Sequence, residues 1–87
     1  MTYRLIWKRT ALRALAAIWN SSPDPNAVTR GANFIERFLM IDPLHEGQPF
    51  GRRYRILFVT PLTVEYSVDQ RDCKVTILRV WFGDKTS

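Results

Sequence analysis

Cysteine, histidine and glycine are scarce in this sequence of 87 residues, which contains one cysteine, one histidine and four glycines. With Cys73 alone, no disulfide can form within the chain, and zinc cannot be held by cysteines alone. The sequence has no glycine-rich phosphate loop and no motif of a nucleophile triad. No apolar run approaches the roughly 18 residues of a membrane-spanning helix, and the first residues lack the apolar stretch of a signal peptide. We therefore expect a cytoplasmic protein that needs no membrane, no metal and no small-molecule cofactor.

The composition is that of a small folded domain with an excess of positive charge. Hydrophobic residues make up 46% of the chain and aromatic residues 13%, which is too apolar for an intrinsically disordered segment. A chain of this length has room for one core, so residues 1–87 are expected to form a single domain. Lysine and arginine number 13 against 8 acidic residues, and the net charge of +5 favours an anionic partner such as nucleic acid, the ribosome or an acidic protein.

The first half of the chain predicts one strand followed by two helices. Alternation over residues 3–8 is typical of a strand, and apolar residues at three- and four-residue steps over residues 11–20 indicate a helix that Thr10 can cap. Prolines end this helix, and Asp24 can cap a second helix over residues 26–41. The tight turn between the two helices predicts an antiparallel helical hairpin.

The second half of the chain is rich in strands. A loop is expected over residues 43–51, and alternating patterns predict strands over residues 53–60, 62–69 and 73–82. The resulting order is β-α-α-β-β-β, which predicts an α+β fold in which a helical hairpin covers one face of an antiparallel sheet. The first strand would join this four-stranded sheet at its side or at its centre.

The phase of the strand patterns separates a buried face of the sheet from an open one. We expect Tyr54 and Tyr66 to face the helices and to enter the core. The opposite face would present polar side chains to a partner. The candidates for this open face are Arg53, Arg55, Thr63, Glu65 and Arg79. Because three guanidinium groups crowd into residues 52–55, they either contact an anion or remain solvated without a fixed partner.

Three segments give the chain a resemblance to a known family. They are the opening Leu5-Ile6-Trp7, residues 42–47 (DPLHEG) and the closing residues 75–81 (VTILRVW). In this order and spacing, over nearly the whole chain, they resemble the RelE/ParE superfamily, the toxins of bacterial type II toxin–antitoxin systems. The resemblance implies a RelE/ParE-like fold, growth inhibition, a role in plasmid stabilisation and a cognate antitoxin protein as partner.

Members of this superfamily differ in their target. Some cleave messenger RNA on the ribosome with basic residues of the open face and an acid/base pair near the C-terminus, whereas others block DNA gyrase. If the chain cleaves RNA, its catalytic residues are expected to be Arg53, Arg55 and Arg79. The cleaving branch has a further arginine at the position of Thr63, and its acid/base pair falls on Trp81 and Phe82, neither of which can exchange a proton near neutral pH. Glu65 is the remaining candidate for a base.

The resemblance therefore favours a toxin that blocks DNA gyrase by binding, without chemistry of its own. One alternative is a ribosome-dependent mRNA endoribonuclease, with the ribosome and mRNA as partners. Another is a degenerate, non-toxic homologue that binds antitoxin or nucleic acid. The binding residues are expected to be Arg52, Arg53, Arg55, Arg79, Trp81, Phe82 and Lys85. Trp81 and Phe82 can stack on bases, or one of the two can pack beneath a helix instead.

Two single residues are expected to have no special role. His45 has no second histidine with which to share a ligand, so we expect it to face solvent. Cys73 is expected to be an ordinary strand residue rather than a reactive thiol.

The short segment after Phe82 resembles the gyrase-directed branch of the superfamily.

Overall fold

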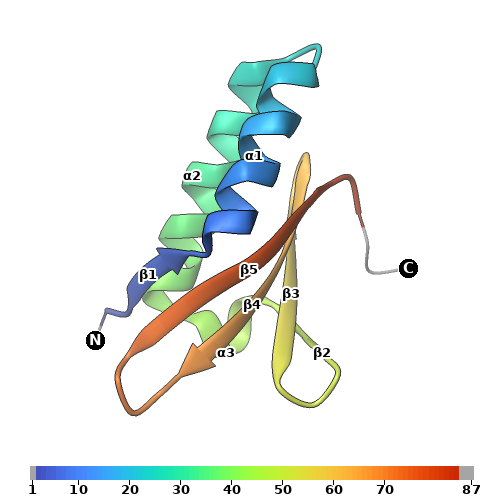
Figure 1. Cartoon of the computed structure of the whole chain (residues 1–87). Coiled ribbons are helices and arrows are strands. Elements are labelled where there is room, and N and C mark those ends of the chain that lie inside the picture. The colour runs from blue at the N-terminus through green and yellow to red at the C-terminus, as the bar shows by residue number, and fades with distance from the viewer. Residues whose placement is uncertain (1, 85–87) are drawn as a thin grey trace.

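The computed structural model describes residues 2–84, which form three helices and five strands (Figure 1). In chain order the elements are β1 (Arg4–Trp7), α1 (Arg9–Ser21), α2 (Pro25–Ile41), α3 (Pro43–Glu46), β2 (Gln48–Phe50), β3 (Tyr54–Val59), β4 (Leu62–Asp69) and β5 (Lys74–Phe82). The expected α+β class is confirmed, with α1 and α2 lying side by side against the sheet. Within residues 2–84, no helix is both long and apolar enough to cross a membrane.

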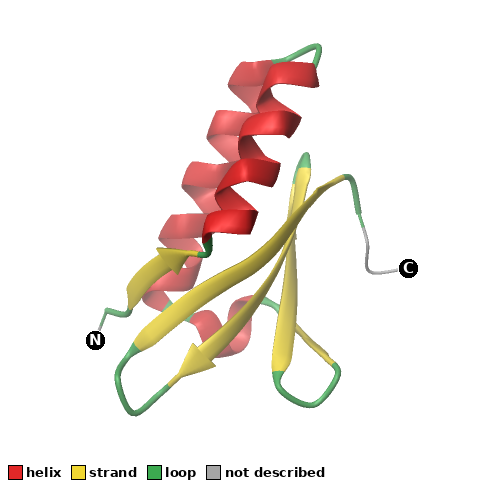
Figure 2. Ribbon diagram, viewed as in Figure 1, coloured by secondary structure: helices red, strands yellow, loops and turns green. Residues whose placement is uncertain are grey.

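The five strands form one mixed sheet in the order β1-β5-β4-β3-β2 (Figure 2). The expected antiparallel arrangement is correct for β3 to β5, but β1 lies parallel to β5 at one edge of the sheet, and the unexpected strand β2 pairs antiparallel with β3 at the other. A parallel neighbour needs a long crossover connection, which the helical hairpin and the strands that follow it provide. The prediction of a loop over residues 43–51 is wrong, because this segment contains the short helix α3 and the edge strand β2. Pro49 is compatible with β2 because an edge strand can spare one backbone donor.

The two long helices begin differently. The Asp24 side chain accepts a hydrogen bond from the backbone N–H of Ala27 at 3.2 Å, and Pro25 occupies the first turn, which confirms the predicted start of α2. The prediction that Thr10 caps α1 is wrong. That helix begins at Arg9 with Lys8 as its N-cap and without a side-chain cap, because the chain turns into the helix directly after β1.

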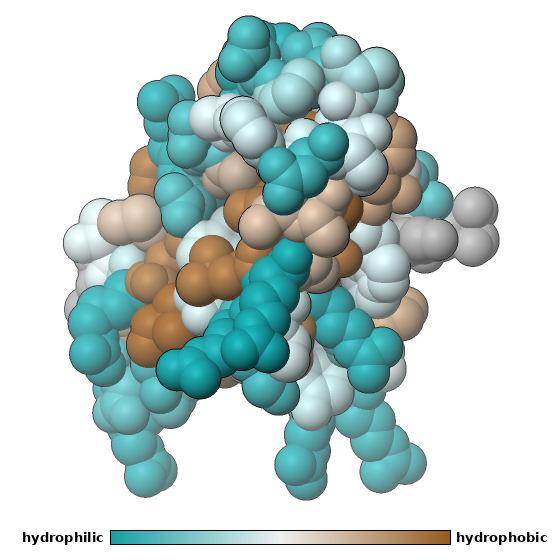
Figure 3. Space-filling view, turned by 45° about the horizontal axis from the view of Figure 1, so that its top comes forward, coloured by the Kyte–Doolittle hydropathy of each residue, from teal (hydrophilic) through white to brown (hydrophobic). Residues whose placement is uncertain are grey.

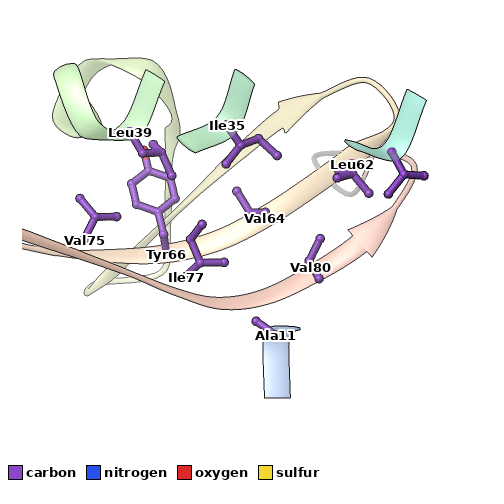
Figure 4. Close-up of a cluster of buried hydrophobic side chains, with 10 residues drawn as sticks. Ala11, Ile35, Leu39, Leu62, Val64, Tyr66, Val75, Ile77 and Val80 are labelled. Atoms are coloured by element: carbon purple, nitrogen blue, oxygen red, sulfur yellow. The ribbon is translucent and has the colours of Figure 1, made fainter. Parts of the chain in front are cut away.

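The core lies between the helical hairpin and the covered face of the sheet (Figure 4). Its buried side chains are Ala11, Val28, Ile35, Leu39, Leu62, Val64, Tyr66, Val75, Ile77 and Val80. The predicted burial of Tyr66 is confirmed, since its side chain is fully enclosed. The predicted burial of Tyr54 is wrong, because its side chain is 40% exposed.

The error at Tyr54 comes from the phase of β3. In the pairing of β3 with β4, Arg55 lies opposite Tyr66 and Leu57 lies opposite Val64. Paired residues of neighbouring strands point to the same face, so Arg55 and Leu57 face the helices while Tyr54 faces the open side. Both sets of alternate residues in this strand contain large apolar side chains, and the sequence pattern therefore left its phase undecided.

Candidate functional site

Arg55 lies on the covered face of the sheet and holds a turn of the chain in place. Its Nη2 donates a hydrogen bond to the Gly47 carbonyl, and its Nε donates to the Tyr66 hydroxyl at 3.4 Å. The Tyr66 hydroxyl in turn donates to the Pro43 carbonyl at 2.7 Å. We call Arg55, Tyr66, Gly47 and Pro43 the tyrosine anchor, because together they fix α3 and the start of β2 against the sheet. The expectation that Arg55 belongs to the open face is wrong.

The anchor also explains the protonation of Tyr66. Burial raises the pKa of the Tyr66 hydroxyl above its usual value of 10.0, and the hydrogen bond and positive charge of Arg55 oppose this effect only in part. The hydroxyl therefore stays protonated near neutral pH and acts as a hydrogen-bond donor to Pro43.

Arg52 and Arg53 lie in the turn between β2 and β3 and are exposed. This turn contains Gly51 in the left-handed region with φ of 76°, a conformation that glycine adopts readily. The two arginines therefore extend from one end of the sheet. The expectation that Arg53 shares the open face with Arg79 is wrong, because the strand that was expected to begin at residue 53 begins at Tyr54.

Arg79 is on the open face, where its charge is compensated. It pairs in register with Glu65 on the neighbouring strand β4, and its Nε lies 3.5 Å from Glu65 Oε1. The Arg79 side chain is 70% exposed and the Glu65 side chain only 10%. A buried carboxylate beside an arginine neutralises the field that a phosphate would otherwise meet. Of the three arginines expected on the open face, Arg79 alone lies there.

Next to the Glu65–Arg79 pair, the residues that lie side by side across the open face are mainly apolar. Thr63 lies between Phe58 on β3 and Trp81 on β5. The Thr63 side chain is fully buried, and its hydroxyl donates a hydrogen bond to the Gly83 carbonyl. Trp81 is half-buried beside it, whereas Phe82 is 54% exposed. Neither Trp81 nor Phe82 fills the core, so both remain accessible to a partner.

A polar cleft of about 490 Å³ joins this open face to the start of α1. The side chains of Lys8 and Thr10 line it on the α1 side, and Tyr54, Arg79 and Trp81 line it on the sheet side. Because Glu65 also lines the cleft and pairs with Arg79, the cleft suits a planar group that can stack on its two aromatic rings. The cleft was not predicted as such, because it depends on the exposure of Tyr54 and on the position of Lys8 at the end of β1.

A second concave surface, of about 500 Å³, lies along α1 and α2, and we call it the helical groove. Its ends are marked by two indole hydrogen bonds, from Trp7 Nε1 to Glu36 Oε2 at 2.7 Å and from Trp19 Nε1 to Thr29 Oγ1 at 3.2 Å. Leu12 between them is 48% exposed. Figure 3 shows apolar side chains gathered in a band between two hydrophilic ends of the molecule. Exposed apolar surface of this kind marks a protein-binding site more often than a catalytic one.

The remaining candidates are placed as follows. His45 is exposed, as predicted, and its Nδ1 lies 2.7 Å from Asp42 Oδ1. Cys73 is not a strand residue: it ends the turn before β5 with φ of 51°, and its thiol lies 3.7 Å from the Gln70 carbonyl. Lys85 lies outside the described residues. Across residues 2–84, no three histidine, cysteine or acidic side chains come together that could hold a metal ion.

Comparisons with known proteins identify the fold. No model of a protein family and no curated protein matches the sequence. Among solved structures, the chain is similar to a chain of the RelBE2 toxin–antitoxin complex of Mycobacterium tuberculosis, with 25% identity, a TM-score of 0.78, and coverage of 94% of this chain and 99% of the other. It is similar to a chain of the chromosomal ParDE system of P. aeruginosa, with 19% identity, a TM-score of 0.72, and coverage of 95% and 98%. It is also similar to the isolated RelE toxin of E. coli, with 12% identity, a TM-score of 0.67, and coverage of 98% and 88%.

Proposed function

Since the chain has the RelE/ParE fold over nearly its whole length, as its sequence indicated, we propose that it is the toxin component of a toxin–antitoxin module. The observation that carries this proposal is the likeness to a chain of the RelBE2 toxin–antitoxin complex, at 25% identity and over 94% of the present chain. The exposed apolar helical groove and the net charge of +5 support the same function, because a toxin of this kind must bind both an antitoxin and a large target.

We further propose that the toxin acts by binding its target rather than by cleaving RNA. Attack of a 2′-hydroxyl on the phosphate requires a base, a cation near the phosphate and an acid for the leaving oxygen. Arg55 is engaged in the tyrosine anchor, and Arg79 is paired with Glu65. Trp81 and Phe82, at the positions expected for an acid/base pair, cannot exchange a proton near neutral pH. The arrangement of these residues favours DNA gyrase over the ribosome as the target.

The antitoxin partner is proposed to be acidic. An amphipathic helix can place its apolar side chains in the helical groove between Trp7 and Trp19. Acidic residues on the same partner would be attracted by the net charge of +5, and this attraction weakens as salt screens it. Affinity for the antitoxin should therefore fall with increasing ionic strength.

Induced expression in a bacterial host tests the function. We expect growth arrest accompanied by DNA damage that depends on gyrase, and no new cuts in ribosome-bound messenger RNA. Arg79→Gln should weaken the arrest because this residue lies in the polar cleft, whereas Arg71→Gln, in the exposed turn before β5, serves as the matched control.

The other outcomes separate the alternatives. Cuts in ribosome-bound RNA that disappear in Arg79→Gln would establish the endoribonuclease instead. Normal growth at high expression, without any antitoxin gene in the host, would contradict the toxin and leave a non-toxic binding homologue. Co-expression of the small gene adjacent to that of the chain should restore growth if it encodes the antitoxin.

A further inference from the structure

One flank of α2 carries a row of exposed side chains that ends in opposite charges. Residues four positions apart lie one above another on a helix and form a ridge along its surface. On α2 and its C-cap this ridge consists of Arg30, Phe34, Phe38 and Asp42, and all four residues are exposed. Asp42 continues the row because its N–H donates to the Phe38 carbonyl at 2.9 Å, as in a helical turn. We call these four residues the α2 ridge.

The middle of the α2 ridge is aromatic. The rings of Phe34 and Phe38 stack with their centroids 6.0 Å apart and an angle of 16° between their planes. The Phe34 side chain is 43% exposed, and Ile41 beside the ridge is 62% exposed. Aromatic and aliphatic surface that stays open to water on a folded domain marks a contact with another protein.

The α2 ridge is separate from the two concave surfaces described above. The helical groove uses another flank of α2, through Thr29, Ala32 and Glu36, and the polar cleft lies on the open face of the sheet. Within residues 2–84, none of the four ridge residues lines either surface. A protein bound to the ridge therefore leaves the helical groove and the polar cleft accessible.

The order of the side chains makes the α2 ridge complementary to a second copy of itself. Two copies of α2 can pack antiparallel about a two-fold axis at the level of residue 36. Phe34 of each helix then lies beside Phe38 of the other, and Arg30 of each lies beside Asp42 of the other. With a rise of 1.5 Å per residue, the two ends of the ridge are about 18 Å apart. The contact therefore holds four aromatic rings between two ion pairs.

The charges favour a second copy over an acidic partner. An acidic partner would be attracted by Arg30 at one end of the ridge and repelled by Asp42 at the other, whereas a second copy pairs both. The guanidinium of Arg37 lies 5.7 Å from the Phe34 ring centroid, at the exposed rim of such a contact. The two copies of Arg37 and the net charge of +5 on each chain oppose pairing, so we expect a weak dimer that forms as concentration rises.

We propose that two copies of the chain pair through the α2 ridge as an antiparallel, two-fold dimer. The dimer leaves the helical groove and the polar cleft of each copy accessible. It therefore presents two copies of each binding surface to a partner. This inference does not depend on which target the chain binds.

Charge reversal at the ends of the ridge tests the inference, with sedimentation equilibrium of the full chain over a range of concentrations as the measurement. For the unchanged chain, the average mass should rise from that of one chain towards that of two. Arg30→Asp and Asp42→Arg should each weaken the dimer about tenfold, because each turns two exposed ion pairs into repulsive contacts. The double variant restores both pairs in reversed order and should recover the original dissociation constant.

The net charge separates this result from a general electrostatic effect. Arg30→Asp lowers the net charge of each chain by two from +5, whereas Asp42→Arg raises it by two. General repulsion between the chains therefore predicts a tighter dimer for Arg30→Asp, while pairing through the ridge predicts a weaker dimer for both. A tighter dimer of Arg30→Asp would overturn the proposal, and so would a double variant that associates no better than the single ones.

Two phenylalanine variants test the aromatic centre. The side chains of Phe34 and Phe50 are each 43% exposed, but Phe50 lies on β2, outside the ridge. Phe34→Ala should weaken the dimer at least about tenfold, because it removes two rings from each contact, whereas Phe50→Ala should leave it unchanged. Equal effects would contradict the proposal. A chain that stays monomeric at every concentration would also overturn it, and a loss of antitoxin binding in Phe34→Ala would then assign the ridge to the antitoxin.

Discussion

The tyrosine anchor makes a quantitative prediction for Tyr66→Phe. The Tyr66 side chain is fully buried, and its hydroxyl donates to the Pro43 carbonyl at 2.7 Å. Phenylalanine keeps the ring, so the substitution opens no large cavity and leaves the core packing in place. What it removes is the partner of a buried carbonyl and one acceptor of Arg55. An unsatisfied buried polar group costs about 1–3 kcal/mol, and we expect the free energy of unfolding to fall by this amount.

Urea unfolding at pH 7 measures this change, with Tyr54→Phe as the matched control. The Tyr54 side chain is 40% exposed, so loss of its hydroxyl should change the free energy of unfolding by no more than about 0.5 kcal/mol. For a domain of this size, each kcal/mol corresponds to about 4–8 °C in Tm. The reasoning is refuted if the two variants are equally stable.

A double-mutant cycle with Arg55→Ala extends the test. Because Arg55 donates to both Gly47 and Tyr66, the two substitutions should not be additive, and we expect a coupling free energy of about 0.5–3 kcal/mol. Arg53→Ala, in the exposed turn, should show no coupling with Tyr66→Phe. Additive effects of Arg55→Ala and Tyr66→Phe would mean that Arg55 does not act through the anchor.

Three further predictions concern the same fold. Burial raises the pKa of Tyr66 in the folded chain, so the unfolded chain loses this proton first, and stability should fall above about pH 10. This fall should be shallower in Tyr66→Phe when urea unfolding is repeated between about pH 8 and 11. Gly47→Ala would place a Cβ 2.5 Å from the Ile56 carbonyl oxygen and from the Tyr66 hydroxyl. Thermal unfolding should therefore show that the free energy of unfolding falls by about 1–3 kcal/mol, and an unchanged value would contradict this close packing. Asp24→Ala removes the capping hydrogen bond from the Ala27 N–H and should lower the free energy of unfolding by about 0.5–2 kcal/mol in the same assay. An unchanged free energy of unfolding would show that water replaces the Asp24 side chain as the cap.

The order of the elements could be predicted from the sequence because each carries a strong local signal. Asp24 and the prolines around it fix the start of α2, and clean alternation identifies β4 with its observed bounds. The three-residue strand β2 was missed because its proline and its position in a glycine-bounded segment are typical of a loop. The parallel pairing of β1 depends on contacts far apart in the sequence, which local patterns do not encode.

The candidate site was predicted less well than the fold, and the reason is the phase of β3. A strand with large apolar residues on both sides gives no preference for either face, and a shift by one residue exchanges them. This shift moves Arg55 from the expected docking surface into the tyrosine anchor and moves Tyr54 onto the open face. Arg79 was placed correctly on the open face, because β5 alternates around the buried Val80. The polar cleft joins residues from both ends of the chain and could not be read from either segment.

The most direct test of the central claim uses purified gyrase, relaxed plasmid DNA and the full chain. We predict that the chain inhibits supercoiling in proportion to the amount added, that the antitoxin relieves the inhibition, and that messenger RNA on purified ribosomes stays intact. Unchanged supercoiling at saturating concentrations, together with cleavage of ribosome-bound RNA, would contradict the account.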